Sequence, residues 1–187
     1  MLLAMLRHGD TAWSADGRIQ GRSDPALTDD ARERLRRFEL PKVCAGMRIV
    51  TSPLARCIET AALLGAPQAR REARIAEMSW GAWEGRRLAD LRAELGAKMS
   101  ENEARGWEFR PDGGETPREV LARVRTWLAE LKEPTLAVTH RGVIRAVYAQ
   151  AAGWDMLGKP PVKLAWDAVH VFRWQENKLA IERVNVR

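Results

Sequence analysis

The chain has 187 residues, of which 45% are hydrophobic and 30% are charged, and it carries a formal net charge of +6 at pH 7. These values are those of an ordinary globular protein of one domain, and they exclude a disordered or fibrous chain. The positive charge does not indicate a nucleic-acid-binding protein, because the arginines alternate with acidic residues, as in Arg32-Glu33-Arg34. A modest positive field equally suits a small anionic substrate.

Short apolar runs alternate with helical periods along the chain, which is typical of an α/β domain with a mainly parallel sheet. The first expected strand covers residues 2–6. We do not interpret this segment as a signal peptide, because it lacks a basic start and runs directly into Arg7. A long loop follows, and Thr28 is then the expected N-cap of a helix with Ala31 and Leu35 on its apolar face.

A second strand is expected at residues 47–51. Ser52 and Pro53 predict the start of the next helix, with Ser52 as its N-cap and Pro53 at the first helical position. This interpretation places Arg56 in the first helical turn, near the carboxyl end of the strand. A further short strand is expected at residues 74–78.

Residues 79–115 are irregular and rich in Trp, Gly and Arg, so we expect an excursion with one or two short helices over the active site of the single domain. The segment Thr116-Pro117-Arg118-Glu119 is a capping box with proline at the first helical position, and it predicts a helix. The remaining expected elements are a strand at 136–139, a helix at 143–151, and two strands at 168–174 and 179–186 that are joined by a hairpin turn.

Three polar motifs each follow an expected strand. They are Arg7-His8-Gly9, the segment from Ser52 to Arg56, and His140-Arg141-Gly142. Ligands of open α/β sheets bind beyond the carboxyl ends of the strands, so we expect the three motifs to converge. The guanidinium groups of arginine and the imidazoles of histidine can donate hydrogen bonds to phosphate oxygens. No cluster of Cys or carboxylate residues indicates a metal site. The sequence therefore predicts a phosphoryl pocket that needs neither a metal ion nor a cofactor.

A neutral imidazole can act as a nucleophile in such a pocket, because one ring nitrogen keeps a lone pair when the other donates its N–H. His8 is the candidate, and Gly9 would let the backbone approach its ring. The leaving alkoxide needs a proton, and Glu77 beside Trp80 is the expected donor, because an apolar environment favours the neutral carboxyl. Glu84 is the second choice for this role.

These residues also have structural interpretations. Arg56 could simply form a salt bridge with Glu59 or Glu33. His140 could be a buried core residue. The joint occurrence of complementary groups at strand ends favours the catalytic interpretation. The third histidine, His170, lies in an alternating late strand, and we interpret it as structural.

Six segments spread over most of the chain form a combined pattern. They are Leu6 to Thr11, Gln20 to Thr28, Ser52 to Ala61, Glu77 with Trp80 to Gly85, Gly113 to Thr116, and Thr139 to Gly142. Together they resemble the motifs of the histidine phosphatase superfamily, also called the phosphoglycerate mutase-like family. The stretch from Trp80 to Gly85 is most similar to the small phosphatases of that family, among them α-ribazole phosphatases and broad-specificity members.

The resemblance implies a three-layer α/β/α sandwich and hydrolysis of a small phosphorylated metabolite through a phosphohistidine intermediate. It implies that His8 is the phosphorylated nucleophile and that Glu77 acts first as an acid and then as a base. The residues implied to bind the phosphoryl group are Arg7, Arg56 and His140. The residues expected to border the substrate are Thr11, Gln20, Ser14 and Trp80.

A cofactor-dependent phosphoglycerate mutase remains an alternative. The mutases of the family follow the glutamate with an arginine and soon a tyrosine, where this chain has Met78-Ser79-Trp80, and they have an asparagine where it has Ser14. Arg86 and Arg87 could partly replace the missing cations. A domain that binds a phosphorylated ligand without turning it over is the other alternative.

Aromatic residues flank the proposed pocket in sequence, and they either bind the leaving group or only pack the irregular segment. They are Trp13, Trp80, Trp83, Trp107 and Phe109, whereas Trp127 lies on an apolar helix face and is expected in the core. Cys44 and Cys57 lack a CxxC spacing and predict a reducing compartment. No apolar run approaches the roughly 20 residues of a membrane span. We therefore expect a cytoplasmic protein with no membrane or nucleic-acid partner, and the sequence indicates no oligomeric state.

Overall fold

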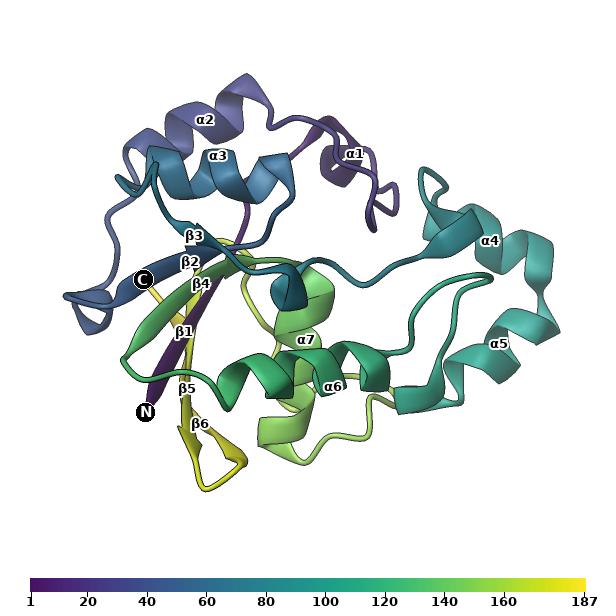
Figure 1. Cartoon of the computed structure of the whole chain (residues 1–187). Helices are drawn as coiled ribbons and strands as arrows, with labels where there is room; N and C mark the ends of the chain where they lie inside the picture. The colour runs from purple at the N-terminus through teal and green to yellow at the C-terminus, as the bar shows by residue number, and fades with distance from the viewer.

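The computed structural model describes residues 1–187, and its centre is a six-stranded sheet with the strand order β3-β2-β4-β1-β5-β6 (Figure 1). The strands are β1 (Leu2–Arg7), β2 (Arg48–Thr51), β3 (Arg70–Arg71), β4 (Thr135–Thr139), β5 (Val169–Gln175) and β6 (Lys178–Val186). The first four strands pair in parallel, whereas β5 is antiparallel to both β1 and β6. This mainly parallel sheet confirms the predicted fold class.

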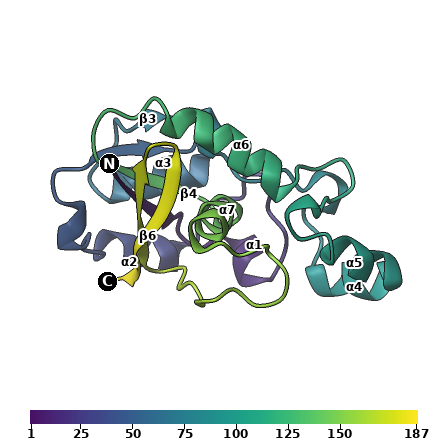
Figure 2. The same ribbon diagram turned by 90° about the horizontal axis from the view of Figure 1, so that it is seen from below.

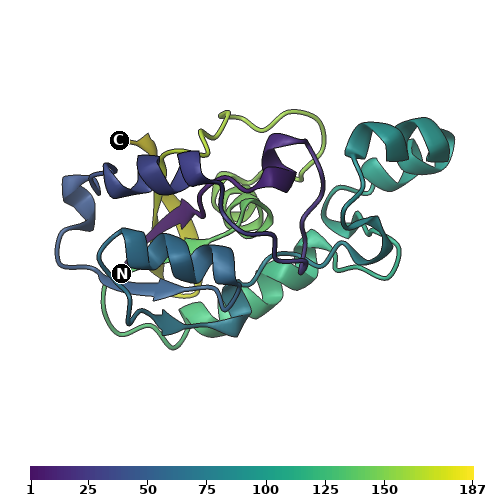
Figure 3. The same ribbon diagram turned by 90° about the horizontal axis from the view of Figure 1, so that it is seen from above.

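Helices cover both faces of the sheet. The helices α2 (Asp29–Arg36) and α3 (Ala55–Leu63) lie on one face, and α6 (Pro117–Leu128) and α7 (Arg141–Ala152) lie on the other (Figures 1, 2 and 3). The largest apolar core lies between the sheet and the pair α6 and α7, and it includes the fully buried Trp127. The three layers and the position of Trp127 are as predicted. None of the helices combines the length and the apolar character needed to cross a bilayer.

Several local sequence signals act as predicted. The hydroxyl of Thr28 accepts the backbone N–H of Ala31 at 3.1 Å and caps α2. Thr116 and Glu119 form the expected capping box, in which each side chain accepts the backbone N–H of the other residue. The hairpin between β5 and β6 turns at Glu176-Asn177, where both residues have positive φ angles. Such two-residue turns match the twist of antiparallel strands.

The strand expected at residues 74–78 is absent. A short 3-10 helix, Ala73–Ile75, stands there instead, and the strand that pairs with β2 is β3, just upstream. The carboxylate of Glu72 accepts the backbone N–H of Arg74 at 3.0 Å and its Nε at 2.8 Å. This side-chain cap satisfies a free N–H group at the start of the short helix and so favours the helical turn over an extended strand.

The segment 79–115 carries α4 (Leu88–Leu95) and α5 (Ala97–Glu103), in agreement with the short helices expected there. All three views show both helices standing clear of the sheet (Figures 1, 2 and 3). A separate apolar cluster of Trp83, Leu91 and Met99 holds this extension together. The other short helices are α1 (Ala12–Ala15), in the loop after β1, and 3-10 helices at Lys42–Cys44, Gly81–Trp83 and Gly106–Glu108.

Candidate active site

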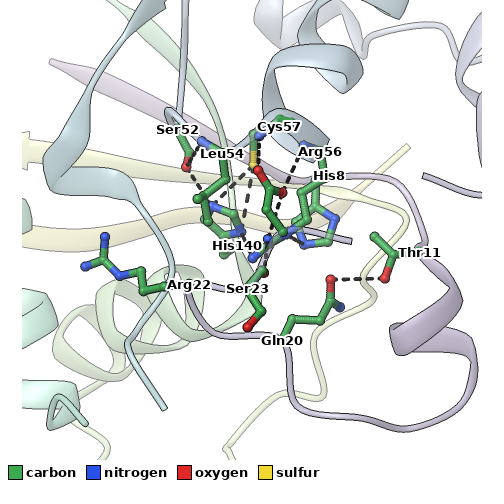
Figure 4. Close-up of polar contacts among 12 residues, drawn as sticks. His8, Thr11, Gln20, Arg22, Ser23, Ser52, Leu54, Arg56, Cys57 and His140 are labelled. Carbon is green, nitrogen blue, oxygen red and sulfur yellow. Dashed lines mark hydrogen bonds and ion pairs between the residues drawn. The ribbon is translucent and has the colours of Figure 1, made fainter. Parts of the chain in front are cut away.

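Two histidines lie next to each other where neighbouring parallel strands end. The strand β1 ends at Arg7 and β4 ends at Thr139, so His8 and His140 leave the sheet at the same edge. The backbone N–H of His8 donates to the carbonyl of Thr139 at 2.9 Å. The two ring centroids are 5.1 Å apart, and both side chains are buried (Figure 4). The first and third polar motifs therefore converge.

The ring of His8 is held in one orientation. Its Nδ1 lies 2.7 Å from the carbonyl oxygen of Gly9, which can only accept, so Nδ1 carries the proton. The lone pair is thus on Nε2, which lies 3.2 Å from Nε of Arg56. A side chain at position 9 would press on Leu35, because a Cβ there would lie 2.8 Å from its Cδ1. Gly9 therefore permits close packing of this loop against α2, while its carbonyl orients the His8 ring.

The surroundings keep both imidazoles neutral. Burial lowers the pKa of His8 well below its usual value of 6.5, and the charges of Arg7 and Arg56 lower it further, against the opposing effect of the Gly9 carbonyl. Burial also lowers the pKa of His140 well below this value, and His8 and Arg56 add to the effect. A neutral imidazole with an unprotonated ring nitrogen is the form that can attack phosphorus.

The guanidinium group of Arg56 is fully buried and joins the two histidines. Its Nε donates to His8, and its Nη2 lies 3.2 Å from Nδ1 of His140. Its Nη1 donates to the carbonyl of Ser23 at 2.7 Å. The two glutamates considered as alternative partners, Glu59 and Glu33, pair with other arginines. Arg56 is therefore a fixed positive charge within the histidine cluster.

Asp24 holds this arginine and caps the helix that carries it. Its carboxylate accepts Nη1 of Arg56 at 3.0 Å, and it also accepts the backbone N–H groups of Ala55 and Arg56. The helix α3 therefore begins at Ala55, and the prediction that Ser52 and Pro53 open it is wrong. The cap comes from a loop 31 residues upstream, which no local pattern could indicate.

Ser52 instead holds the second histidine. Its Oγ lies 2.7 Å from Nε2 of His140, and it accepts the backbone N–H of Leu54 at 3.3 Å. Because Nε2 is engaged by this hydroxyl, Nδ1 is the atom of His140 that faces Arg56 (Figure 4). The thiol of Cys57 lies 3.4 Å from the same Nε2 and packs against the ring.

Glu77 lies over the N-terminus of α7. Its Oε1 accepts the backbone N–H groups of Met78 at 2.8 Å and of Gly142 at 3.1 Å, and a Cβ at position 142 would collide with this oxygen. Burial raises the pKa of Glu77, although these N–H groups and nearby arginines oppose the rise. The residue is 8% exposed and borders the same pocket as His8. A carboxyl group with a raised pKa in this place can donate a proton to a leaving group.

Arg123 fixes the backbone at this carboxyl group. It extends from α6, and its Nη2 donates to the carbonyl of Glu77 at 3.2 Å while its Nη1 donates to the carbonyl of Arg74 at 2.6 Å. Glu115 accepts Nε of Arg123 at 3.0 Å. Sequence reasoning did not single out either residue as functional. Glu115 lies within a motif of the family pattern, whereas Arg123 carried no signal beyond its place on a helix.

Glu84 holds the loop that surrounds Arg56. Its carboxylate accepts the backbone N–H groups of Arg22 at 2.9 Å and of Ser23 at 2.7 Å, together with the Ser23 hydroxyl at 2.7 Å. The carbonyls of Gly21 and Ser23 in this loop in turn accept the guanidinium of Arg56. Burial alone would raise the pKa of Glu84, but its hydrogen-bond donors hold it below the usual value. This argues against Glu84 as a second choice of proton donor.

We expect Glu84→Gln to lower kcat by about 10- to 100-fold, since a displaced loop would move Arg56 away from its productive position. In this variant, the amide NH₂ of glutamine would face the N–H and O–H donors whose hydrogen bonds the Glu84 carboxylate accepts in the wild type. Alkyl and aryl phosphates should slow equally, because Glu84 positions a cation and transfers no proton. Glu94→Gln, which removes an exposed partner of Arg86, is the matched control. Selective loss of alkyl phosphates alone would contradict the positioning role.

We expect Arg56→Ala to lower kcat/KM by about 10²–10³-fold, as when a preorganised charge-stabilising donor is removed. The Arg56 charge lowers the pKa of His8, so its loss should raise that pKa. The acid limb of the kcat/KM profile should therefore move to higher pH. Arg56→Lys keeps the positive charge but loses the planar set of guanidinium N–H donors. Circular dichroism reports whether both variants fold. A folded variant with a near-normal rate and an unmoved acid limb would contradict this role.

A pocket of about 780 Å³ opens in front of these groups. Of the predicted catalytic residues, Arg7, His8 and Glu77 line it, and Arg56 and His140 are fully buried next to His8. Of the predicted substrate residues, Gln20, Ser14 and Trp80 line it. Thr11 does not, because it is fully buried and its hydroxyl donates to Oε1 of Gln20 at 3.0 Å. Thr11 therefore supports a pocket residue from behind.

Two of the five loop aromatics singled out from the sequence line the pocket. They are Trp80 and Phe109, whose rings lie 5.7 Å apart. Trp83 belongs to the core of the extension, Trp107 packs against the main core, and the ring of Trp13 lies over Gly85. Packing therefore explains most of these side chains.

His170 lies in β5 and is fully buried, and its Nε2 lies 3.1 Å from the carbonyl of Ala165. Its Nδ1 accepts the backbone N–H of Asn185 at 3.4 Å. The residue does not line the pocket and has the structural role expected of it. No group of three or more His, Cys, Asp or Glu side chains is arranged to hold a metal ion.

Comparison with known proteins gives consistent results. The chain matches the histidine phosphatase superfamily (branch 1) over residues 3–187. It is 32% identical over 179 residues to a glucosyl-3-phosphoglycerate phosphatase of Mycobacterium tuberculosis, covering 83% of this chain and 79% of the relative. It is 29% identical to phosphoserine phosphatase 1 of Hydrogenobacter thermophilus, covering 82% and 77%. A 2,3-bisphosphoglycerate-dependent phosphoglycerate mutase of Azorhizobium caulinodans is also 29% identical, with 78% and 79% covered.

Solved structures agree with these sequence relatives. A mycobacterial glucosyl-3-phosphoglycerate phosphatase solved with VO3 superposes with a TM-score of 0.77 at 27% identity, covering 100% of this chain and 99% of the other. A protein of Thermus thermophilus superposes with a TM-score of 0.78 at 30% identity, with both chains fully covered at 100%. From its sequence and its fold alike, the chain belongs to branch 1 of the histidine phosphatase superfamily.

Proposed function

We propose that this protein hydrolyses small phosphomonoesters by transferring the phosphoryl group to Nε2 of His8. The observation that carries the proposal is the contact of 3.2 Å between this nitrogen and Nε of the buried Arg56, while the proton on Nδ1 is committed to Gly9. The nucleophile and a cation for the phosphoryl oxygens are therefore in place before substrate binds. Preorganised charge of this kind is the main source of catalysis in phosphoryl transfer.

In the first half-reaction, the positive charges of Arg7 and Arg56 stabilise the phosphoryl oxygens, and His140 packs beside His8. The lone pair on Nε2 of His8 forms a bond to phosphorus as the bond to the leaving oxygen breaks. Glu77 gives its proton to that oxygen, and the alcohol leaves. In the second half-reaction the Glu77 carboxylate takes a proton from water, and the hydroxyl attacks phosphorus. Phosphate departs, and His8 regains its lone pair.

The positions of Arg86 and Arg87 favour hydrolysis over the mutase alternative. Arg86 pairs with Glu94 and Arg87 with Asp16, and neither arginine lines the pocket. They do not replace the cations that a mutase uses for a bisphosphorylated intermediate. We expect phosphate release from 3-phosphoglycerate without net formation of 2-phosphoglycerate, whether or not 2,3-bisphosphoglycerate is added.

The experiment that tests the function is release of p-nitrophenol from p-nitrophenyl phosphate by the purified protein in the presence of a chelator. Turnover under these conditions is expected, because arginines and histidines supply the charge in the site. Binding of phosphate without any turnover would favour the alternative of a non-catalytic domain that binds phosphorylated ligands.

A further inference from the structure

Two arginines on the first turns of α7 line the pocket and form no ion pair within the protein. Arg141 and Arg145 lie one helical turn apart, and no ion pair or hydrogen bond engages either guanidinium group. The other arginines of the pocket wall are all paired, Arg7 with Asp10, Arg18 with Asp16 and Arg92 with Glu103. The two cations on α7 are therefore the ones free to bind a ligand.

Tryptophans support both guanidinium groups. The Cζ of Arg141 lies 4.9 Å from the ring centroid of Trp166, and that of Arg145 lies 5.2 Å from the ring centroid of Trp154. Stacking covers one face of a guanidinium group and leaves the N–H donors along its edge free. Trp166 itself lines the pocket, so the stack keeps Arg141 in the pocket wall.

The arrangement is costly unless an anion completes it. Like charges at i and i+4 on a helix repel each other, and the half-buried Arg145 also loses hydration, whereas Arg141 is more exposed. Desolvation lowers the pKa of Arg141, and the charge of Arg7 lowers it further while Glu77 opposes the shift. Desolvation and the charge of Arg141 lower the pKa of Arg145. An anion between the two groups would offset both effects through charge-assisted hydrogen bonds.

The position of these arginines points to the leaving group. Arg141 directly precedes Gly142, whose N–H holds the carboxylate of Glu77 at 3.1 Å. A proton donor must lie at the bridging oxygen of the ester, so the leaving group extends from that point into the pocket. In the proposed mechanism, the phosphoryl group already lies among Arg7, Arg56 and the histidines. Arg141 and Arg145 are therefore placed to contact the other end of the substrate.

We infer that Arg141 and Arg145 form a second anion site, and that the preferred substrates are phosphomonoesters whose leaving group carries its own carboxylate or phosphate. This inference rests on the proposed function, since it assigns the rest of the same substrate. Of the two roles considered for the loop aromatics, packing applies to most of them, because only Trp80 and Phe109 of the five line the wall.

The test uses two pairs of substrates that differ in the second anion. In 3-phosphoglycerate a carboxylate replaces the hydroxymethyl group of glycerol 3-phosphate, and fructose 1,6-bisphosphate adds a phosphate to fructose 6-phosphate. Phosphate release gives the ratio of kcat/KM within each pair. We expect a ratio of about 10 to 100 for at least one pair, the range for losing a hydrogen bond to a charged group. The pair with the high ratio identifies the anion as carboxylate or phosphate.

Arg141→Gln and Arg145→Gln should each bring that ratio toward one, mainly through KM. Arg183→Gln, which removes an exposed and unpaired arginine of β6, is the matched control and should keep the wild-type ratio. An active enzyme with ratios near one for both pairs, or ratios that survive both substitutions, would overturn the inference but leave the proposed function intact. If the wild type does not cleave p-nitrophenyl phosphate, the proposed function fails. Calorimetric titration with 3-phosphoglycerate and glycerol 3-phosphate then tests the anion site alone.

Discussion

His8→Ala is expected to lower kcat by roughly 10⁴-fold or more, the scale on which hydrolases lose activity without their nucleophile. The reason is geometric as well as chemical. His8 presents a lone pair on Nε2 beside the guanidinium group of Arg56, and no other side chain of the pocket offers an unprotonated nitrogen in that place. Residual turnover should reflect only the charges that remain.

The covalent intermediate gives an independent readout of the same prediction. During turnover, the wild type should carry an acid-labile, base-stable phosphate, and peptide mass spectrometry should locate it on His8. His170→Gln is the matched control, because this histidine lies in β5 and does not line the pocket. It should keep the label if it folds. An undiminished rate in His8→Ala, or a phosphate on another residue, would reject the assignment.

The convergence of the site was predictable because it depends on a general property of parallel sheets. Apolar runs that end in Arg7-His8 and in Thr139-His140 mark two strands, and the carboxyl ends of parallel strands share one edge. The structure confirms that His8 and His140 meet there, with their ring centroids 5.1 Å apart. The same logic could not give the ring orientations, since these depend on the Gly9 carbonyl and on the Ser52 hydroxyl.

Long-range partners explain what the sequence could not indicate. Asp24 caps a helix that starts 31 residues later, and Glu84 holds a loop more than 60 residues upstream. Neither contact follows a helical or strand period, so no local pattern predicts it. The wrong start of α3 has this cause, because the true cap lies outside the window in which capping signals are read. The sequence also could not indicate that Arg141 forms no ion pair, because this depends on which acidic side chains lie near it in the folded protein.

Glu77→Gln is expected to slow alkyl phosphates by about 10²–10⁴-fold, the contribution of a positioned general acid. The amide keeps the size of the side chain and one oxygen for the N–H groups of Met78 and Gly142. It has no proton to give to an alkoxide. The loss for p-nitrophenyl phosphate should be far smaller, because its phenolate leaves readily without protonation.

The pH dependence separates this role from a purely structural one. Burial raises the pKa of Glu77, so the protonated form persists above the usual range of a glutamate and is lost as pH rises through the raised pKa. The ratio of kcat/KM between the wild type and Glu77→Gln for an alkyl phosphate should therefore fall as the pH rises on the basic side. Taking this ratio at each pH cancels the effect of substrate ionisation, which is the same for both proteins. On the acid side, the lowered pKa of His8 keeps the nucleophile neutral below pH 6.5 in both proteins. Equal slowing of alkyl and aryl phosphates, with an unchanged basic limb, would assign the proton to another group and leave Glu77 with a structural role at the start of α7.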